Sequence, residues 1–159
     1  MSDTIRILGI DPGTNITGFA VVEFAPQPRL VEAGTFRTDA KADLADRIAQ
    51  IHADLTELLA EIPVDSLAVE QLYSHYAHPR TSIIMGHARG VILLAAAQAK
   101  IPIRHLAATK IKKSLTGNGH ATKRQMQLAV QSVFGLAEPP EPADVADAIA
   151  IALCAGNYL

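Results

Sequence analysis

Two acidic residues close apolar segments of the sequence. Asp11 follows the apolar run 5–10, and Glu70 follows the apolar run 67–69. An acid at the end of a buried strand costs folding free energy unless a cation or a hydrogen-bond donor meets it. Asp-Pro-Gly is also good turn chemistry, so for Asp11 taken alone a structural and a functional role weigh equally. Glu70 repeats the pattern, which favours a shared function.

Two further acids, Asp144 and Asp147, lie three residues apart, on one face of a helix that is expected to begin at Pro142. The apolar run 148–153 follows, so this helix is expected to pack into the core. An aspartate in the first turn complements the helix dipole, which suffices to explain Asp144 but not both acids. Four acids at the ends of buried elements are therefore expected to converge at one edge of a sheet.

Carboxylate oxygens with no His or Cys among them are ligands for a hard cation. They suit Mg²⁺, with Mn²⁺ as a possible substitute, rather than Zn²⁺. Two divalent ions per site would balance the charge of four carboxylates. Such a pair of ions clamps the attacking and leaving oxygens of a phosphodiester during in-line displacement. The acids therefore predict metal-dependent phosphodiester chemistry.

The elements that must position these acids follow from apolar periodicity. Three strands come first, with no helix between them, which favours an antiparallel start. Helices and strands alternate afterwards. We expect strands over residues 5–10, 17–24, 30–37, 66–71 and 101–106, and helices over 42–59, 81–100, 109–115, 122–134 and from 142 onwards. This order predicts an α/β fold, a mixed five-stranded sheet with helices on both faces.

Charge is distributed unevenly along the chain, whose formal net charge is −2. Residues 1–70 contain 5 Lys and Arg against 12 Asp and Glu, residues 71–137 contain 9 against none, and residues 138–159 contain none against 4. A long acid-free stretch is suited to hold a polyanion, because each neutralised phosphate releases counterions. The alternative is a set of basic helix faces that only contact water.

Length and composition predict one folded domain over residues 1–159. The chain is 49% hydrophobic and long enough to fold without a disulfide or a structural metal. The single Cys154 excludes an intramolecular disulfide and favours a reducing compartment. The apolar run over residues 91–97 is too short to span a bilayer, and no secretory signal precedes the first strand. We expect a cytoplasmic protein that does not enter a membrane.

Five segments, read together, resemble the RuvC family of bacterial Holliday-junction resolvases. They are I-L-G-I-D-P-G-T (7–14), A-V-E-Q (68–71), G-H-A-R-G-V (86–91), K-K-S-L-T-G-N-G (112–119) and P-A-D-V-A-D-A (142–148). The resemblance covers nearly the whole chain and implies a ribonuclease H-like fold. It also implies a homodimer that cuts four-way DNA junctions in recombination and repair by paired, symmetric, metal-dependent nicks, leaving 5′-phosphate and 3′-hydroxyl ends. A branch-migration complex of the RuvA and RuvB type is the implied partner.

The resemblance assigns roles to residues of this sequence. Asp11 matches the acid that ligates both metals, and the other site acids are Glu70, Asp144 and Asp147. The residues expected to contact DNA are Tyr73, Arg80, Arg89, Lys110, Lys112, Lys113, Asn118, Lys123 and Arg124. Of these, Lys112 and Lys123 flank a Gly-Asn-Gly turn that a DNA backbone can approach closely.

An aromatic side chain after Glu70 matches the family position that stacks on a base. Tyr73 holds this position, and Tyr76 is a competing candidate; such stacking contributes roughly 1–3 kcal/mol per base. His87 stands where the family usually has Gln, and the loop 74–80 also departs from the family pattern, so the preferred cleavage sequence stays open. His75 and His78 have no Cys or other ligands clustered near them, which disfavours a structural zinc.

The helix over residues 81–100 contains Gly86 and Gly90, one turn apart. Glycine inside a helix costs about 0.5–1 kcal/mol relative to alanine, so the close approach of another element is the expected compensation. Apolar residues occur on more than one face, with Val91 and Leu94 on one and Ile83 towards another. We expect one face to cover the sheet and another to contact a twin helix across a two-fold axis.

Other functions fit the sequence less well. An actin-like ATPase needs two such domains and a second Asp-Gly loop, and this chain has one D-P-G-T and too few residues. A junction-binding module without chemistry would gain nothing from four acids at its binding surface. A ribonuclease H-like nuclease that acts on structured RNA is the main alternative, and the long acid-free stretch favours the junction enzyme over it.

Overall fold

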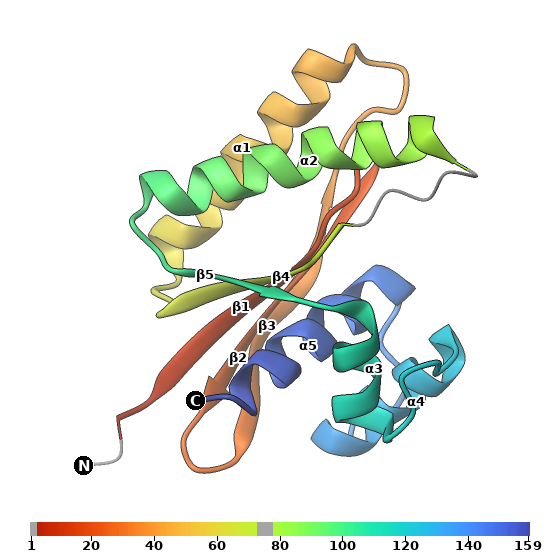
Figure 1. Cartoon of the computed structure of the whole chain (residues 1–159). Coiled ribbons are helices and arrows are strands. Elements are labelled where there is room, and N and C mark those ends of the chain that lie inside the picture. The colour runs from red at the N-terminus through yellow and green to blue at the C-terminus, as the bar shows by residue number, and fades with distance from the viewer. Residues whose placement is uncertain (1–2, 73–77) are drawn as a thin grey trace.

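The computed structural model describes residues 3–72 and 78–159 (Figure 1). Its strands are β1 (Ile5–Asp11), β2 (Ile16–Phe24), β3 (Pro28–Arg37), β4 (Ser66–Glu70) and β5 (Ile103–Leu106). Its helices are α1 (Leu44–Glu61), α2 (Pro79–Gln98), α3 (Ala108–Thr116), α4 (Lys123–Phe134) and α5 (Ala143–Gly156). The order and type of all ten elements are as the sequence predicts.

The five strands form one mixed sheet in the order β3-β2-β1-β4-β5. β1 pairs with β2, and β2 with β3, in antiparallel fashion, whereas β4 runs parallel to both β1 and β5. Helices α1 and α2 lie on one side of the sheet, and α3, α4 and α5 lie on the other (Figure 1). The expected mixed sheet with helices on both faces is therefore confirmed.

Alternation along β1 divides its side chains between two cores. Leu8 and Ile10 belong to the cluster that packs against α1 and α2, and Ile7 belongs to the cluster formed with α5. Residues two apart on a strand share a face, so Asp11 lies on the same face as Ile7 and is directed to the α5 side. Within the described part of the chain, each helix falls short of the length or apolarity that crossing a membrane requires.

The ends of the elements differ from the sequence prediction by one or two residues. The helix expected over 81–100 ends at Gln98, and Lys100 has a φ of 57°. A left-handed residue cannot continue a right-handed helix, so the chain turns there into β5. Helix α5 begins at Ala143, and Pro142 precedes it as the N-cap residue.

The face of α2 also differs from the prediction. Ala88, Ile92, Ala95 and Ala96 are buried, whereas Ile83 and Leu94 are 64% and 50% exposed. Leu94, which the prediction groups with Val91 and apart from Ile83, is therefore exposed like Ile83, whereas Val91 is partly buried against the core. No element of the described chain approaches Gly90, because a Cβ built there meets no atom within 4 Å, so the expected close approach by a twin helix stays a prediction.

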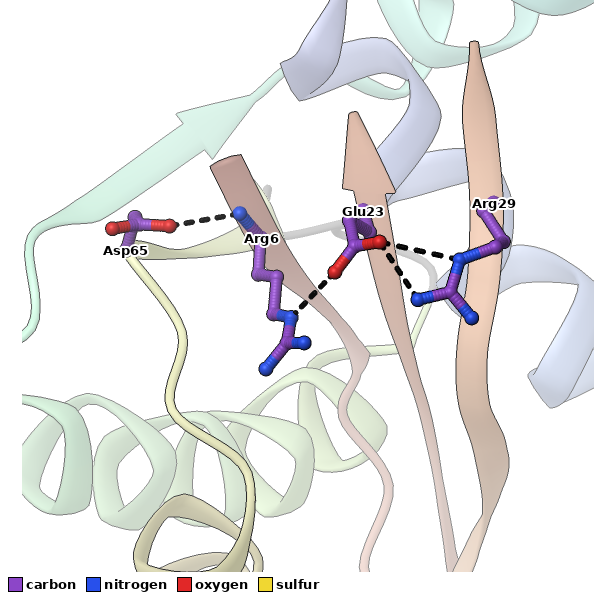
Figure 2. A network of polar contacts seen from close by, with 4 residues as sticks. All are labelled: Arg6, Glu23, Arg29 and Asp65. Carbon is purple, nitrogen blue, oxygen red and sulfur yellow. Dashed lines mark hydrogen bonds and ion pairs between the residues drawn. The ribbon is translucent and has the colours of Figure 1, made fainter. Parts of the chain in front are cut away.

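The end of the sheet where β1 begins carries a network of paired charges (Figure 2). The guanidinium groups of Arg6 and Arg29 contact the carboxylate of Glu23 at 2.9 Å and 2.7 Å. The backbone N–H of Arg6 donates to the carboxylate of Asp65 at 2.8 Å. Each acidic group in this network therefore has a donor, which joins β1, β2 and β3 to the loop before β4.

Candidate functional site

The opposite end of the sheet carries the predicted acids. Asp11 is the last residue of β1 and Glu70 the last residue of β4. These two strands are parallel neighbours whose pairing runs as far as Ile10 and Val69. Because neighbouring parallel strands end at the same edge of a sheet, both carboxylates project from one edge.

Helix α5 contributes the other two acids because two glycines let it lie directly on the sheet. A Cβ at Gly9 would overlap the carbonyl oxygen of Ala148, and a Cβ at Gly18 would overlap that of Asp144. Gly18 is also the β2 residue opposite Asp11. The absence of side chains at these two positions therefore sets the first turns of α5, with Asp144 and Asp147, beside Asp11.

The electrostatics of the four acids show that they are close together. Burial raises the pKa of Asp11 to about 8, and repulsion from Asp147, Asp144 and Glu70 and a side-chain hydrogen bond with Asp144 contribute to the shift. Burial and the charge of Asp147 also raise the pKa of Glu70. The four side chains predicted from distant parts of the sequence thus share one site, in which neighbouring charges oppose the ionisation of Asp11 and Glu70.

Two lysines counteract this repulsion. Burial raises the pKa of Asp147, while Lys123 and Lys112 act to lower it, and Lys112 acts in the same direction on Glu70. One cavity of about 190 Å³ between α3, α4 and α5 is lined by Glu70, Asp147, Lys112 and Lys123. Two of the predicted DNA contacts and two of the predicted metal ligands are therefore walls of the same cavity.

The donor set fits a divalent cation in its chemistry, since it consists of carboxylate oxygens without His or Cys. The described residues contain no group of three or more His, Cys, Asp or Glu side chains that could hold a metal ion as they stand. The charges of Asp147, Asp144 and Glu70 contribute to the raised pKa of Asp11, and a cation would replace that repulsion by attraction. Ligation by Asp11, Glu70, Asp144 and Asp147 stays a prediction.

The turn after Asp11 is held by a buried threonine. The Thr17 hydroxyl donates to the carbonyl of Gly13 at 2.7 Å and accepts from the Gly13 N–H at 3.3 Å. Thr17 has no solvent exposure, so the loop is anchored to the interior of the sheet. The Asp-Pro-Gly segment therefore does form a turn, and its acid also faces the site, so the structural role of the segment is compatible with the predicted function of Asp11.

Most of the predicted DNA contacts lie on the surface of α3, α4 and their connection. Gly117 has a φ of 77° and ends α3, and the Asn118 side chain accepts from the His120 N–H at 2.9 Å. The exposed residues of this surface are Lys113, Asn118, Lys123 and Arg124. Of these, Lys123 also lines the 190 Å³ cavity. The Gly-Asn-Gly turn is thus an ordered feature beside the site.

Other predicted contacts are placed differently. The Lys110 ammonium lies 3.8 Å from the centroid of the Tyr158 ring, which follows the end of α5 opposite to Asp144. Arg80 is exposed in the first turn of α2. Tyr73 lies outside the described residues, as does its competitor Tyr76. Lys110 is therefore not brought to the acids, and the role of the tyrosines stays a prediction.

Arg89 is turned inward. Its Nε donates to the main-chain carbonyl of Glu70 at 3.3 Å, and its Nη2 lies 2.6 Å from His105 Nδ1. Sequence reasoning gave His105 no individual role, because only the β4–β5 register, which sets His105 opposite Val69, brings it near the site. A basic residue within an acid-free stretch is an insufficient signal for this contact, which depends on packing between distant elements.

The fold and the site together define a class of protein. A mixed five-stranded sheet in this order, with acids ending β1 and β4 and beginning a helix packed across them, is a ribonuclease H-like fold arranged as a nuclease. The family model described as crossover junction endodeoxyribonuclease RuvC matches residues 7–155. The chain belongs to the RuvC family.

Relatives and solved structures agree with this assignment. The chain is 54% identical over 154 residues to a crossover junction endodeoxyribonuclease RuvC from Rhodopirellula baltica, covering 96% of this chain and 86% of the relative. It is 42% identical over 153 residues to the protein of the same description from Moorella thermoacetica, and the match covers 96% of this chain and 91% of that relative.

The structure of T. thermophilus RuvC in complex with Holliday junction substrate superposes with a TM-score of 0.89, at 33% identity, covering 97% of this chain and 94% of that one. The yeast mitochondrial Holliday junction resolvase Ydc2, with a TM-score of 0.68 and 12% identity, covers 94% of this chain and 77% of its own and shares the fold.

Proposed function

We propose that this chain is a crossover junction endodeoxyribonuclease that resolves four-way DNA junctions in recombination and repair. The observation that carries the proposal is the convergence of Asp11, Glu70 and the α5 aspartates in a site that also contains Lys112 and Lys123. Paired carboxylates beside cationic side chains are the arrangement that phosphodiester hydrolysis needs, since the acids bind metal and the lysines bind phosphate. Membership of the RuvC family specifies the junction as the substrate.

The proposed cofactor is Mg²⁺, with Mn²⁺ as a possible substitute and two ions in each site. Asp11, Glu70, Asp144 and Asp147 would hold the ions, with Asp11 shared between them. When bound, such ions activate a water molecule for attack and stabilise the leaving 3′ oxygen, which leaves 5′-phosphate and 3′-hydroxyl ends. Because ligation relieves the repulsion that raises the pKa of Asp11 and Glu70, we expect the carboxylates to ionise as the metal binds.

The residues of the chain itself orient the reacting strand. Asp11 and Glu70 project from neighbouring strands of one sheet, so the distance between their main chains is fixed by strand pairing. Lys112 and Lys123 form one wall of the cavity whose other wall carries Glu70 and Asp147. A phosphate held by the lysines therefore lies next to the carboxylates. The Gly-Asn-Gly turn, which follows α3, leaves its own main chain accessible beside that position.

The two nicks in opposing strands require two copies of the site, and α2 offers a surface for dimerisation. Ile83, His87, Gly90 and Leu94 are exposed and follow the four-three-four spacing of a helix seam. Nothing in the described chain fills the space above Gly90, and a helix can approach closely at a glycine. We propose that the α2 helices of two copies meet along this seam.

The wider setting of the enzyme follows from its substrate. We propose that it acts in the cytoplasm, where bacterial chromosomal DNA is accessible, as one nuclease domain over residues 1–159. A branch-migration complex of the RuvA and RuvB type is the proposed partner, because it would present the junction to both sites of the dimer. Co-sedimentation of the purified chain with such a complex on a junction would test this partnership.

The central experiment is cleavage of a synthetic four-way junction with Mg²⁺ or Mn²⁺, with structured RNA as the competing substrate. We expect paired nicks in the junction from the wild type and none from Asp11→Asn. Preferential cutting of the RNA would favour the alternative, a ribonuclease H-like nuclease acting on RNA. Equal cutting by wild type and Asp11→Asn would contradict the proposed site.

The dimer is tested separately. Ile83→Glu places a charge on an exposed position of α2, so the fold is expected to persist while association weakens. Sedimentation at micromolar concentrations should show the wild type as a dimer and the variant as a monomer. A wild type that stays monomeric throughout this range would contradict the proposed interface.

A further inference from the structure

The contacts of Arg89 distinguish it from the other basic residues near the site. The side chain is partly buried, and its guanidinium connects three elements: it projects from α2, donates to the last carbonyl of β4, and contacts His105 on β5. Lys113, Lys123 and Arg124, by contrast, are exposed. A guanidinium with two protein partners is held in place rather than presented to a ligand.

The carbonyl that Arg89 contacts lies where β4 loses its neighbour β1, although Glu70 still pairs with Leu106 of β5. The pairing between β1 and β4 ends at Ile10 and Val69, one residue before Glu70. The Arg89 Nε–H supplies a donor to the Glu70 carbonyl at this point. Because a peptide group with a satisfied carbonyl has less freedom to rotate, the contact restricts the direction in which the Glu70 side chain leaves the main chain.

The chemistry of the second contact defines the state of His105. Arginine carries donors and no acceptor, so His105 Nδ1 must accept from Arg89 Nη2. His105 is therefore neutral in this contact, with its proton on Nε2. The two acceptors, His105 Nδ1 and the Glu70 carbonyl, together fix the plane of the guanidinium. A lysine ammonium is not planar and cannot reproduce this paired geometry.

Arg89 also approaches Glu70 from the side opposite to the other acids. Glu70 is affected by Asp147 and Lys112, which belong to the elements on the α5 side of the sheet, whereas Arg89 comes from α2 on the other side. A cavity of about 80 Å³ has Asp11, Glu70 and Arg89 among its walls. Arg89 is therefore adjacent to the site while its hydrogen bonds are made to the protein.

We propose that Arg89 is a positioning residue for Glu70, oriented by His105, and not a contact to DNA phosphate. This inference rests on the proposed metal-dependent function and revises the role that the sequence suggested for Arg89. Residues that orient metal ligands affect metal affinity by about 10–100-fold when they are substituted. The two roles predict different measurements, since a phosphate contact affects junction affinity and its salt dependence.

The test compares Arg89→Ala and Arg89→Lys with Arg104→Ala. Arg104, the neighbour of His105 on β5, donates to the Ala155 carbonyl at 3.1 Å, near the end of α5 remote from Asp144. It is a matched control because it also loses an arginine–carbonyl hydrogen bond. The measurements are Mn²⁺ affinity from the paramagnetic resonance signal of free Mn²⁺, junction affinity in EDTA over a range of salt concentrations, and the melting temperature.

We expect Arg89→Ala to weaken Mn²⁺ binding about tenfold or more, Arg89→Lys to weaken it less, and Arg104→Ala to leave it unchanged. Junction affinity in EDTA should stay within about twofold of the wild type, with the same salt dependence. Unchanged Mn²⁺ affinity in Arg89→Ala, or a salt slope reduced by about one, would overturn the positioning role in favour of a phosphate contact. An equal loss of Mn²⁺ affinity in Arg104→Ala would overturn it in favour of general destabilisation.

A second variant covers the case in which Arg89→Ala does not fold. His105→Leu removes the acceptor and leaves Arg89 in place, and His105→Gln keeps an acceptor. We expect weaker Mn²⁺ binding in His105→Leu and partial recovery in His105→Gln, whereas equal affinities in both would contradict the role of His105. A wild type that binds no Mn²⁺ would refute the proposed metal site itself, a result distinct from unchanged variants.

Discussion

Acidic side chains have opposite surroundings at the two ends of the sheet. At the end where β1 begins, Glu23 is paired with Arg6 and Arg29, and hydrogen bonds from these guanidinium groups lower its pKa (Figure 2). At the end where β1 finishes, Asp11 faces three other acids, and burial together with their charges raises its pKa to about 8. Strand β1 takes part in both sets of contacts, through Arg6 at one end and Asp11 at the other.

This difference separates a structural acid from functional ones. Each oxygen of Glu23 has a guanidinium partner, so the group is stabilised by the folded protein as it stands. The acids around Asp11 are instead buried against like charges, which opposes folding unless a cation is present. A protein retains such an arrangement where binding a cation serves its activity, and the comparison therefore locates the site without reference to relatives.

The sharpest way to break the comparison is the same substitution at both ends. Glu70→Gln removes a proposed metal ligand, and junction cleavage should fall by more than the roughly hundredfold that loss of an outer-shell partner causes. Glu23→Gln should leave cleavage unchanged, because Glu23 lies at the other end of the strands. Single-turnover cleavage rates measure both, and a similar loss in the two variants would contradict the division of roles.

A smaller effect is expected from displacing α5. Gly18→Ala puts a Cβ on the Asp144 carbonyl, so α5 must move away from β2 and carry its aspartates with it. A displacement of about 1 Å can cost up to roughly a hundredfold in rate, and we expect a loss of at least tenfold. Gly86→Ala is the control, since its Cβ meets only the Leu72 side chain, at an ordinary contact distance of 3.8 Å. Cleavage by Gly18→Ala at the wild-type rate would show that α5 need not lie so close to the sheet.

The lysines should affect binding more modestly. Lys112→Ala and Lys123→Ala each remove one cation from the cavity, so junction affinity should weaken and the slope of log affinity against log salt should fall by about one. Lys110→Ala should change neither, because its ammonium is engaged with Tyr158. Anisotropy titrations in EDTA at several salt concentrations measure these slopes. An unchanged slope in Lys112→Ala and Lys123→Ala would remove the phosphate role.

The smallest effect is a change of stability with pH. The pKa of Asp11 is about 8 in the folded protein against an ordinary 3.8, so the folded state holds a proton that the unfolded chain releases between these values. The free energy of unfolding in EDTA should therefore fall as the pH rises from about 4 to 8. Asp11→Asn should lose less stability over this range and should have a higher melting temperature than the wild type at pH 8. Each kcal/mol of added stability corresponds to a rise of roughly 2–4 °C in the melting temperature.

Glu23 should change the stability with pH in the opposite direction. Its pKa is lowered, so its contribution to stability is present at neutral pH and is lost as the pH falls through the lowered value. Glu23→Gln should therefore lower the melting temperature at pH 7, whereas Asp11→Asn should raise it. Calorimetry from pH 4 to 9 measures both, and a lower melting temperature for Asp11→Asn in EDTA would contradict the repulsion among the acids.

The sequence predicted the elements and the convergence of the acids because both depend on local patterns. Asp11 and Glu70 each end an apolar strand, and strand ends that share an edge bring their side chains together. The alternation along β1 also places Asp11 on the same face as Ile7, towards α5. The fold class and the position of the site therefore follow from apolar periodicity and from acids at unexpected places.

What could not be predicted depends on contacts between distant elements. Arg89 is indistinguishable in sequence from the exposed basic residues, and only the packing of α2 over β4 and β5 turns it to Glu70 and His105. The glycines behaved similarly: Gly18 is essential for the approach of α5, whereas the space expected to be filled at Gly90 is open within the described chain. The periodicity of apolar residues predicts which residues share a face of a helix, but it does not predict which of those faces another element covers.

The most direct test of the central claim is to locate a bound cation. Crystals of the protein soaked in Mn²⁺ should show anomalous density bounded by the carboxylates of Asp11, Glu70 and the α5 aspartates. The result that would contradict the claim is Mn²⁺ bound elsewhere, with these four carboxylates free of density, in crystals of a preparation that cuts four-way junctions in the same Mn²⁺ concentration.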